Sequence, residues 1–314
     1  MITQPAGSAS VMPAGRIALI ASNAIGDTLV LMVIVQNLLR NGVDVTVFGQ
    51  PAYALRQWFP GVAIEPLPAQ SEEEALLAQF DTVLQMHTHQ PIPRLAQIHP
   101  RVCHLDAIDV ENRPGCMAEN FADFCRRELG LQDVRHSNGM MPPSGLMHRC
   151  HVRRVAIHPE ASTQDKRWLP ERFLRLAVRL RKRGYDVQFI IAPHERERWC
   201  ELERWGIPAP TFANLHELAS WLYESGWFIG NDSGMGHLAS SLNVPTISLF
   251  RRRRVSERWR PAWGTVDVVL PWQWLPFGWL KEKLWRETLT CARVLSAFNR
   301  MVRRYGDGGH PMAS

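Results

Sequence analysis

Apolar runs and helical patterns alternate from the first residues of the chain onwards. Residues 16–21 form a short apolar run that is typical of a buried strand. Residues 28–40 are apolar at helical spacing and end at Asn41-Gly42, a common signal for the end of a helix. Residues 43–48 predict a second strand. This order predicts a parallel pair of strands, because a crossover helix brings the chain back to the same end of the sheet.

The same alternation returns in the second half of the chain. We expect strands at 154–158, 187–192, 227–230 and 245–250, and helices at 170–183, 194–205, 215–224 and 235–243. Two such series predict an α/β protein with two Rossmann-like, doubly wound domains that face each other across a cleft. Ligands of such sheets bind beyond the carboxyl ends of the strands, so we expect the site in the cleft.

Composition adds limits to this interpretation. Of 314 residues, 46% are hydrophobic and 21% charged, and no apolar run is long enough to cross a membrane. The start of the chain lacks the pattern of a secretory signal, and the six cysteines include no CxxC pair, so we expect a cytoplasmic protein with reduced thiols. The net charge of +6 favours polyanionic partners. Because no nucleic-acid-binding motif accompanies it, nucleic acid is not expected among them.

The strongest local motif is the glycine-rich turn Gly230-Asn-Asp-Ser-Gly-Met-Gly-His237 between a strand and a helix. The unpaired N–H groups at the start of that helix favour an anion, and Gly234 and Gly236 would let a phosphate approach the backbone. Ser233 and His237 can donate hydrogen bonds to it. The alternative is a plain capped helix with a packed histidine.

Two further turns between a strand and a helix carry polar side chains. The loop 158–170 offers the hydroxyls of Ser162 and Thr163 and the cations of Lys166 and Arg167. This set suits an anion, although an exposed loop with ordinary surface charges is the alternative.

Asp27 lies in the first such turn, where an ionised carboxylate can serve as a general base. The alternative is a helix-capping aspartate.

Taken together, these segments resemble the ADP-heptose:lipopolysaccharide heptosyltransferases of glycosyltransferase family 9. The matching pieces are Ile25-Gly26-Asp27, Ser162 to Pro170, Pro193-His194-Glu195, Asp232 to Ala239, Pro245 and Leu249-Phe250. Residues 87–150 carry no part of the resemblance. The resemblance implies a GT-B fold and an inverting, metal-independent transfer from a nucleotide sugar, with ADP-heptose as the first choice and no cofactor.

The resemblance also implies roles for particular residues. Asp27 corresponds to the base that deprotonates the acceptor hydroxyl, Lys166 to the lysine that neutralises the donor diphosphate, and Glu195 to the acid that contacts the nucleoside. Asp232 corresponds to a contact with the donor sugar. The donor-binding set is Ser162, Thr163, Lys166, Glu195, Asp232, Ser233, Gly234 and His237.

One segment departs from the family pattern. The family usually continues its last strand with Gly-Pro-Thr, whereas Arg251 to Arg254 follow Phe250 here. We interpret Arg251 and Arg252 as candidate additional anion contacts, with a solvated loop as the alternative. This difference affects the expectation that the donor sugar is heptose more than it affects the expected fold.

The remaining polar and aromatic clusters give weaker indications. His87 and His89 lie on one face of a strand, but no third ligand is evident, so we expect no metal. His104, Asp106 and Asp109 are expected to be structural or to lie on the acceptor side. Six tryptophans between Trp259 and Trp285, near Lys281, Lys283 and Arg286, suit either a membrane interface or packing of this segment onto the first domain.

These observations lead to a division of the chain and to a set of partners. The expected parts are a flexible leader (1–15), an acceptor-side domain (16–150), a donor-binding domain (151–275), a helical segment packed on the N-terminal domain (276–305) and a disordered tail (306–314). Expected partners are a nucleotide sugar, a glycan, lipid-linked or protein acceptor, and a peripheral contact with the inner membrane. The alternatives are a transferase of another nucleotide sugar, a sugar-nucleotide epimerase and a non-catalytic binding subunit.

Overall fold

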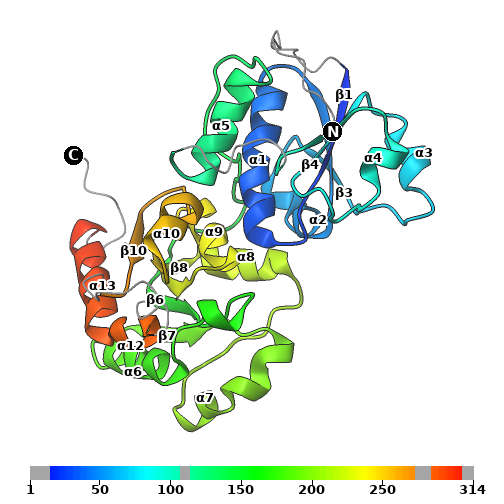
Figure 1. Ribbon diagram of the computed structural model, residues 1–314. Helices are drawn as coiled ribbons and strands as arrows, with labels where there is room; N and C mark the ends of the chain where they lie inside the picture. Colours follow the sequence, from blue (N-terminus) through cyan, green and yellow to red (C-terminus); the bar gives the residue numbers. More distant parts are fainter. Residues whose placement is uncertain (1–14, 107–113, 273–283, 306–314) are drawn as a thin grey trace. The chain divides into compact units, whose positions relative to one another are not determined.

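The protein is described by a computed structural model that covers residues 15–106, 114–272 and 284–305 (Figure 1). The chain divides into two compact units, Met1–Met141 and Pro142–Ser314. Most of the expected leader and the whole expected tail lie outside the described residues. Among the described helices, none has both the length and the apolar character needed to span a bilayer.

The N-terminal unit contains a parallel five-stranded sheet with the order β3-β2-β1-β4-β5. Its strands are β1 (Arg16–Ile20), β2 (Asp44–Phe48), β3 (Ala63–Glu65), β4 (Thr82–Gln85) and β5 (Val102–His104). Its helices are α1 (Ile25–Arg40), α2 (Gln50–Ala54), the 3-10 turn η1 (Arg56–Trp58), α3 (Glu73–Leu77), α4 (Leu95–Ile98) and α5 (Met117–Arg127). The expected first strand–helix–strand unit is thus confirmed, with the helix beginning at Ile25.

The C-terminal unit contains a second parallel five-stranded sheet, ordered β10-β9-β8-β6-β7. Its strands are β6 (His151–His158), β7 (Asp186–Phe189), β8 (Ser225–Asn231), β9 (Thr246–Leu249) and β10 (Val266–Val269). Its helices are η3 (Gln164–Lys166), α6 (Pro170–Arg181), η4 (Pro193–Trp199), α7 (Glu201–Arg204), α8 (Leu215–Tyr223), α9 (Gly234–Ser241), α10 (Arg253–Trp259), α12 (Trp285–Thr288) and α13 (Cys291–Tyr305). Both sheets confirm the predicted fold class.

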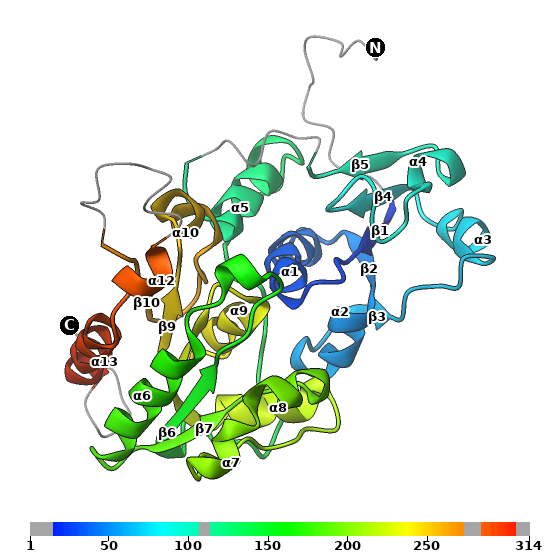
Figure 2. The ribbon, with the colours of Figure 1, turned by 60° about the horizontal axis from the view of Figure 1, so that its bottom comes forward.

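Helices cover both faces of the C-terminal sheet. The side chains of β8 alternate, and Trp227 and Ile229 join one buried cluster with residues of α6 and α13 such as Phe173 and Phe298. Helix α9 packs against β8, β9 and α8 instead. Figure 2 shows α6 and α13 side by side, apart from α8 and α9. Because successive strand residues point to opposite faces, this alternation lets one sheet serve two helical layers.

The boundary between the units lies closer to the N-terminus than expected. The unit begins at Pro142 rather than near residue 151, since the chain before β6 is already tied to β8. The buried Arg149 donates from Nε to the carbonyl oxygen of Gly226 at 3.0 Å, and its guanidinium lies over the Trp227 ring. These contacts assign the segment to the second sheet.

The C-terminal helix does not pack where the sequence led us to expect. Helix α13 packs against α6, β9 and β10 within the C-terminal unit. Its apolar face fits the open face of this sheet, where the Phe298 ring lies 5.3 Å from Trp227 and 4.9 Å from Tyr185. Residues 291–305 of the segment expected to pack on the N-terminal domain are thus part of the core of the C-terminal unit, and residues 276–283 lie outside the described part.

Candidate functional site

One buried side chain links the glycine-rich turn to the loop after β6 by hydrogen bonds. Asn231, the last residue of β8, accepts a hydrogen bond from the Trp168 backbone N–H at 3.1 Å and donates to the Pro159 carbonyl oxygen at 2.6 Å. This amide holds both ends of the loop 159–168 beside the turn. The two candidate anion-binding segments therefore lie together at the carboxyl end of the sheet.

Lys166 and Asp232 form an ion pair between these two segments. Lys166 Nζ lies 3.1 Å from Asp232 Oδ2, with 39% of the lysine side chain exposed and 11% of the aspartate. Burial raises the pKa of the Asp232 carboxyl, and the lysine charge partly offsets this shift. The resemblance placed both residues in the donor site, and the structure brings them into contact.

The start of α9 supplies a buried hydroxyl group. Ser233 precedes the helix, yet its side chain makes no capping hydrogen bond, and its Oγ is buried without a hydrogen-bond partner in the described part of the chain. The plain-cap alternative for this turn therefore lacks its hydrogen bond. Gly234 begins the helix, and His237 is buried in the first turn.

Gly236 does not fulfil its expected role in the turn. An added Cβ at this position would lie 3.4 Å from Pro261 Cγ and 3.6 Å from Ser248 Oγ. The glycine therefore faces protein atoms rather than an open approach for a phosphate.

A cavity of about 190 Å³ opens beside the Lys166–Asp232 pair. Asp165, Lys166, Asp232, Arg251, Arg252 and Val255 line it. Arg251 is ion-paired with Asp165, and it is largely buried. A hydrogen bond from Thr163 and the charge of Arg251 hold the pKa of Asp165 below its ordinary value. The first two arginines of the departing segment thus lie with the lysine and not on a separate surface.

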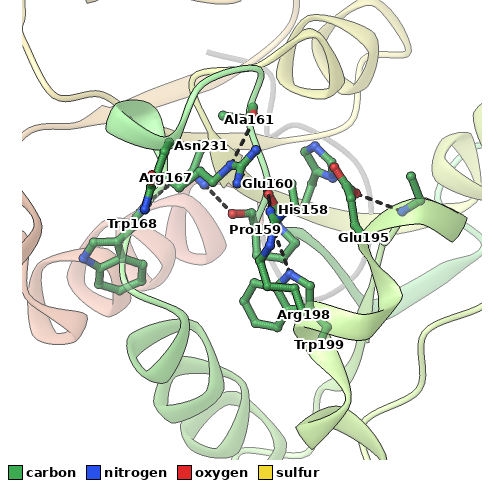
Figure 3. Close-up of polar contacts among 12 residues, drawn as sticks. His158, Pro159, Glu160, Ala161, Arg167, Trp168, Glu195, Arg198, Trp199 and Asn231 are labelled. Atoms are coloured by element: carbon green, nitrogen blue, oxygen red, sulfur yellow. Dashed lines mark hydrogen bonds and ion pairs between the residues drawn. The ribbon is translucent and has the colours of Figure 1, made fainter.

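Other members of the predicted donor set lie outside this cavity lining. Ser162 is exposed on the loop, and Thr163 is engaged with Asp165. The Glu195 carboxylate accepts a hydrogen bond from the Ala192 N–H at 3.0 Å and is 14% exposed. Figure 3 shows Glu195 beside His158, whose pKa is lowered by burial.

Glu160 is a residue of the site region that the sequence did not single out. Its carboxylate is buried and accepts hydrogen bonds from Arg198 at 3.0 Å and Trp199 Nε1 at 2.8 Å, and it forms an ion pair with Arg167, whose Nε lies 2.8 Å away (Figure 3). A glutamate directly after His158-Pro159 at the end of a strand was the available signal. This network fixes the path of the loop that carries Lys166, because a buried carboxylate needs all of these donors.

In the N-terminal unit, Asp27 lies in the first turn of α1 and is 24% exposed. Its Oδ2 accepts a hydrogen bond from Ser22 Oγ at 3.1 Å and lies 3.5 Å from His87 Nε2. The helix is preceded by Ala24, so Asp27 is not the capping residue. Ser22 and His87 follow the ends of β1 and β4, and the sequence did not connect either with Asp27.

Asp106 and Thr88, which follow the carboxyl ends of β5 and β4, form a second polar contact in this region. Asp106 accepts hydrogen bonds from the backbone N–H and the hydroxyl of Thr88, at 2.8 and 2.7 Å. Burial alone would raise the pKa of Asp106, but these bonds and the nearby His87 and His104 lower it. Within the described residues, no group of three potential metal ligands includes His87 or His89. Asp109 lies outside the described part.

Part of the sequence is similar to known proteins. Residues 140–271 match the family model described as glycosyltransferase family 9 (heptosyltransferase). Lipopolysaccharide heptosyltransferase 3 of Escherichia coli (strain K12) is 32% identical over 127 residues, which are 38% of this chain and 36% of that protein. The match thus spans about a third of the length of this relative.

Solved structures resemble the chain over almost its whole length. The E. coli ADP-heptose lipopolysaccharide heptosyltransferase II has a TM-score of 0.70 at 16% identity, with 92% of this chain and 98% of that chain covered. The E. coli heptosyltransferase WaaC with ADP has a TM-score of 0.65 at 15% identity, with 91% and 99% covered. At this identity the likeness concerns the fold. The chain therefore has the GT-B fold of these solved structures, and its residues 140–271 are similar to glycosyltransferase family 9 (heptosyltransferase).

Proposed function

We propose that the protein is an inverting, metal-independent glycosyltransferase that moves a sugar, first of all heptose from ADP-heptose, to a hydroxyl of a glycan or lipopolysaccharide acceptor. The observation that carries the proposal is the Lys166–Asp232 pair in a cavity that Arg251 and Arg252 also line. The matched relative is named a lipopolysaccharide heptosyltransferase, and WaaC has been solved with ADP and with ADP-2-deoxy-2-fluoro heptose.

The donor side has the charges that a nucleoside diphosphate requires. In this proposal, Lys166, Arg251 and Arg252 neutralise the diphosphate, and the hydroxyl of Ser233 donates to one of its oxygens. As Lys166 turns to the phosphates, Asp232 becomes free to accept a hydrogen bond from a sugar hydroxyl. Three side-chain cations around the leaving group can supply the stabilisation that a divalent metal gives in other enzymes, because charge placed in advance is effective in a dry site.

The acceptor side centres on Asp27. Its carboxylate takes the proton of the acceptor hydroxyl as the oxygen attacks the anomeric carbon, and the nucleoside diphosphate leaves from the opposite face. This single displacement inverts the anomeric centre. Ser22 and His87 position the carboxylate, since they contact the same oxygen. A base held by two partners keeps the orientation that proton transfer needs.

A transfer assay with several nucleotide sugars tests the proposal directly. Purified protein is incubated with ADP-heptose, ADP-glucose, UDP-glucose or GDP-mannose, each with and without a heptose-deficient lipopolysaccharide acceptor, in the presence of EDTA. We expect turnover with ADP-heptose only when the acceptor is present, and a product whose anomeric configuration is opposite to that of the donor. Conversion of the donor without acceptor would instead identify an epimerase, and absence of donor binding would identify a non-catalytic subunit.

A lipid-linked acceptor would also place the protein at a membrane. We propose that it acts at the cytoplasmic face of the inner membrane as a peripheral protein, without a spanning helix. In this proposal, contact with the bilayer is made by a surface of the folded protein.

A further inference from the structure

Two arginine-rich helices of the C-terminal unit lie side by side and run in the same direction. Near their beginnings, the Cys291 thiol of α13 donates to the Arg172 carbonyl oxygen of α6 at 3.3 Å. Near their ends, Arg183 donates to Asn299 Oδ1 at 2.8 Å. Figure 1 and Figure 2 both show the pair at the side of the unit. The two helices therefore form one continuous surface.

The outer faces of this pair carry two rows of arginines. On α6, Arg175 and Arg179 are exposed, while Leu176, Ala177 and Leu180 are buried beneath them. The row continues into Arg181, Lys182 and Arg183. On α13, the exposed cations are Arg293, Arg300, Arg303 and Arg304. We call the set of exposed cations on α6, on residues 182–183 and on α13 the arginine face.

Acidic side chains neutralise little of the arginine face. Asp267 lies 3.7 Å from Arg300 and 3.5 Å from Arg304. Among the described residues, no carboxylate is ion-paired with Arg175, Arg179 or Arg293. Like charges spaced four apart on a helix repel each other and lower its stability. The repulsion among these arginines therefore lowers the stability of the free protein. Binding to an anionic surface would offset this repulsion, which gives the cluster a physical reason.

We propose that the arginine face docks the protein on an anionic phospholipid surface. Guanidinium groups bind phosphate through paired hydrogen bonds, and their long stems reach from a helix to a headgroup layer. Two parallel helices present their cations over a broad area, which matches the many headgroups of a bilayer. The face belongs to the surfaces of α6 and α13, whereas the donor cavity is lined by residues of η3, by residues of two loops and by Val255 of α10.

An exposed tryptophan favours a bilayer over a nucleic acid as the partner. Trp205, next to the end of α6, is 48% exposed, and its carbonyl oxygen accepts a hydrogen bond from Arg181 at 3.0 Å. Indole side chains favour the level of the headgroups. Within α6 and α13, both described throughout, no exposed aromatic side chain stands between the arginines to stack on bases. The choice of a membrane also rests on the lipid-linked acceptor of the proposed function.

Co-sedimentation of the full chain with vesicles tests the proposal. Vesicles of phosphatidylcholine alone are compared with vesicles that also contain phosphatidylglycerol. We expect binding to the anionic vesicles only, weakened by added salt. The variant R175E/R179E/R293E should bind at least about a hundredfold more weakly, since each cation near the surface contributes roughly fivefold. Trp205→Ala should weaken binding by a smaller factor.

A matched variant separates the arginine face from net charge. Arg94, Arg101 and Arg127 are exposed in the N-terminal unit, and their replacement by glutamate changes the net charge by the same amount. This control should bind vesicles within about twofold of wild type, far above R175E/R179E/R293E. Thermal unfolding of both variants checks that each is folded.

Three outcomes would overturn the proposal. They are equal binding by R175E/R179E/R293E and wild type, an equal loss in both triple variants, and binding of wild type to duplex DNA but not to anionic vesicles. Transfer to a water-soluble acceptor, measured in parallel, should be unaffected in R175E/R179E/R293E. Vesicle binding without any transfer would refute the proposed function alone, so the two failures are distinguishable.

Discussion

At the residue scale, the site depends on charged groups whose partners are distant in sequence. Asp27 contacts His87, 60 residues further along the chain, and Lys166 contacts Asp232. Residue type and local spacing identified Asp27 and Lys166 as candidates, and the resemblance to the family added Asp232. They did not identify the positioning partners Ser22 and His87, because these come together only when β1 and β4 pair. A histidine that looked like half of a metal site is thereby a neighbour of the candidate base.

Asp27→Asn provides the sharpest test of the acceptor side. The amide cannot take a proton from the acceptor hydroxyl, so we expect kcat to fall by about 10²- to 10⁴-fold while the Kd for the donor stays within about twofold. His87→Gln should lower kcat less, because it removes a positioning contact and not the base. Steady-state kinetics and calorimetric titration with ADP measure both effects. Unchanged turnover in Asp27→Asn would exclude this aspartate as the base.

Glu160→Gln tests the network behind the Lys166 loop. The change leaves Arg167 and Arg198 without their shared carboxylate, and loss of one partner of a buried ion pair costs about 3–5 kcal/mol. Because both arginines reach solvent, we expect the free energy of unfolding to fall by about 2 kcal/mol, less than for a fully buried pair. Urea denaturation measures this, with Glu203→Gln on the exposed face of α7 as the control. Equal stability of the two variants would contradict the role given to Glu160.

Asp232→Asn tests whether burial or the Lys166 ion pair dominates at Asp232, through the dependence of stability on pH. Burial raises the pKa of Asp232 in the folded protein, so ionisation of this group works against folding. Below the unfolded pKa the carboxyl is protonated in both states, and the variant should match wild type. As pH rises through the raised folded pKa, wild type should lose stability relative to Asp232→Asn. Thermal melts from about pH 3 upwards, at about unit intervals, would show this growing difference, and a difference of opposite sign would mean that the Lys166 pair outweighs burial.

At the scale of elements, periodicity predicted most of the strands, and tertiary packing decided the rest. The expected helix at 194–205 is divided into η4 and α7, with the chain turning near Cys200. The short elements between β3 and α5 carry too few apolar positions for a clear period, so strand β5 was not predicted. Helix α13 has a distinct amphipathic pattern, which fixes its existence but not the surface that it covers.

Phe298→Ala tests the place of α13 in the C-terminal core. Phe298 is 1% exposed between Trp227 and Tyr185, so we expect a loss of about 3–5 kcal/mol from the cavity that the change creates. Ser296→Ala, on the exposed face of the same helix, should change stability by less than about 0.5 kcal/mol. Urea unfolding compares the two variants. A small effect of Phe298→Ala would mean that α13 is an appendage rather than part of the core.

At the scale of the whole molecule, the two units carry separate buried clusters. One cluster lies among residues of the N-terminal sheet and its helices, and another joins α6 and α13 to the C-terminal strands. Every residue that lines the donor cavity belongs to the C-terminal unit, whereas Asp27 belongs to the N-terminal unit. Two alternating series in the sequence were enough to predict two sheets. Which unit would hold the C-terminal helix depended on the shapes of the open sheet faces, and these are not visible in a hydrophobic pattern.

This separation leads to a calorimetric prediction about the donor. Two cores of their own should unfold in two steps, and a ligand that binds only the folded C-terminal unit should move only one of them. At about a hundred times its Kd, ADP should stabilise that unit by about 2.7 kcal/mol. Phe298→Ala identifies the step, because it should lower the same transition that ADP raises. Lys166→Ala should abolish the ADP shift, whereas Lys182→Ala, an exposed lysine just beyond α6, should retain it. A shift of the other transition, or of both equally, would place the nucleotide in contact with the N-terminal unit as well, so the donor site could then no longer be assigned to the cavity beside Lys166 and Asp232 alone.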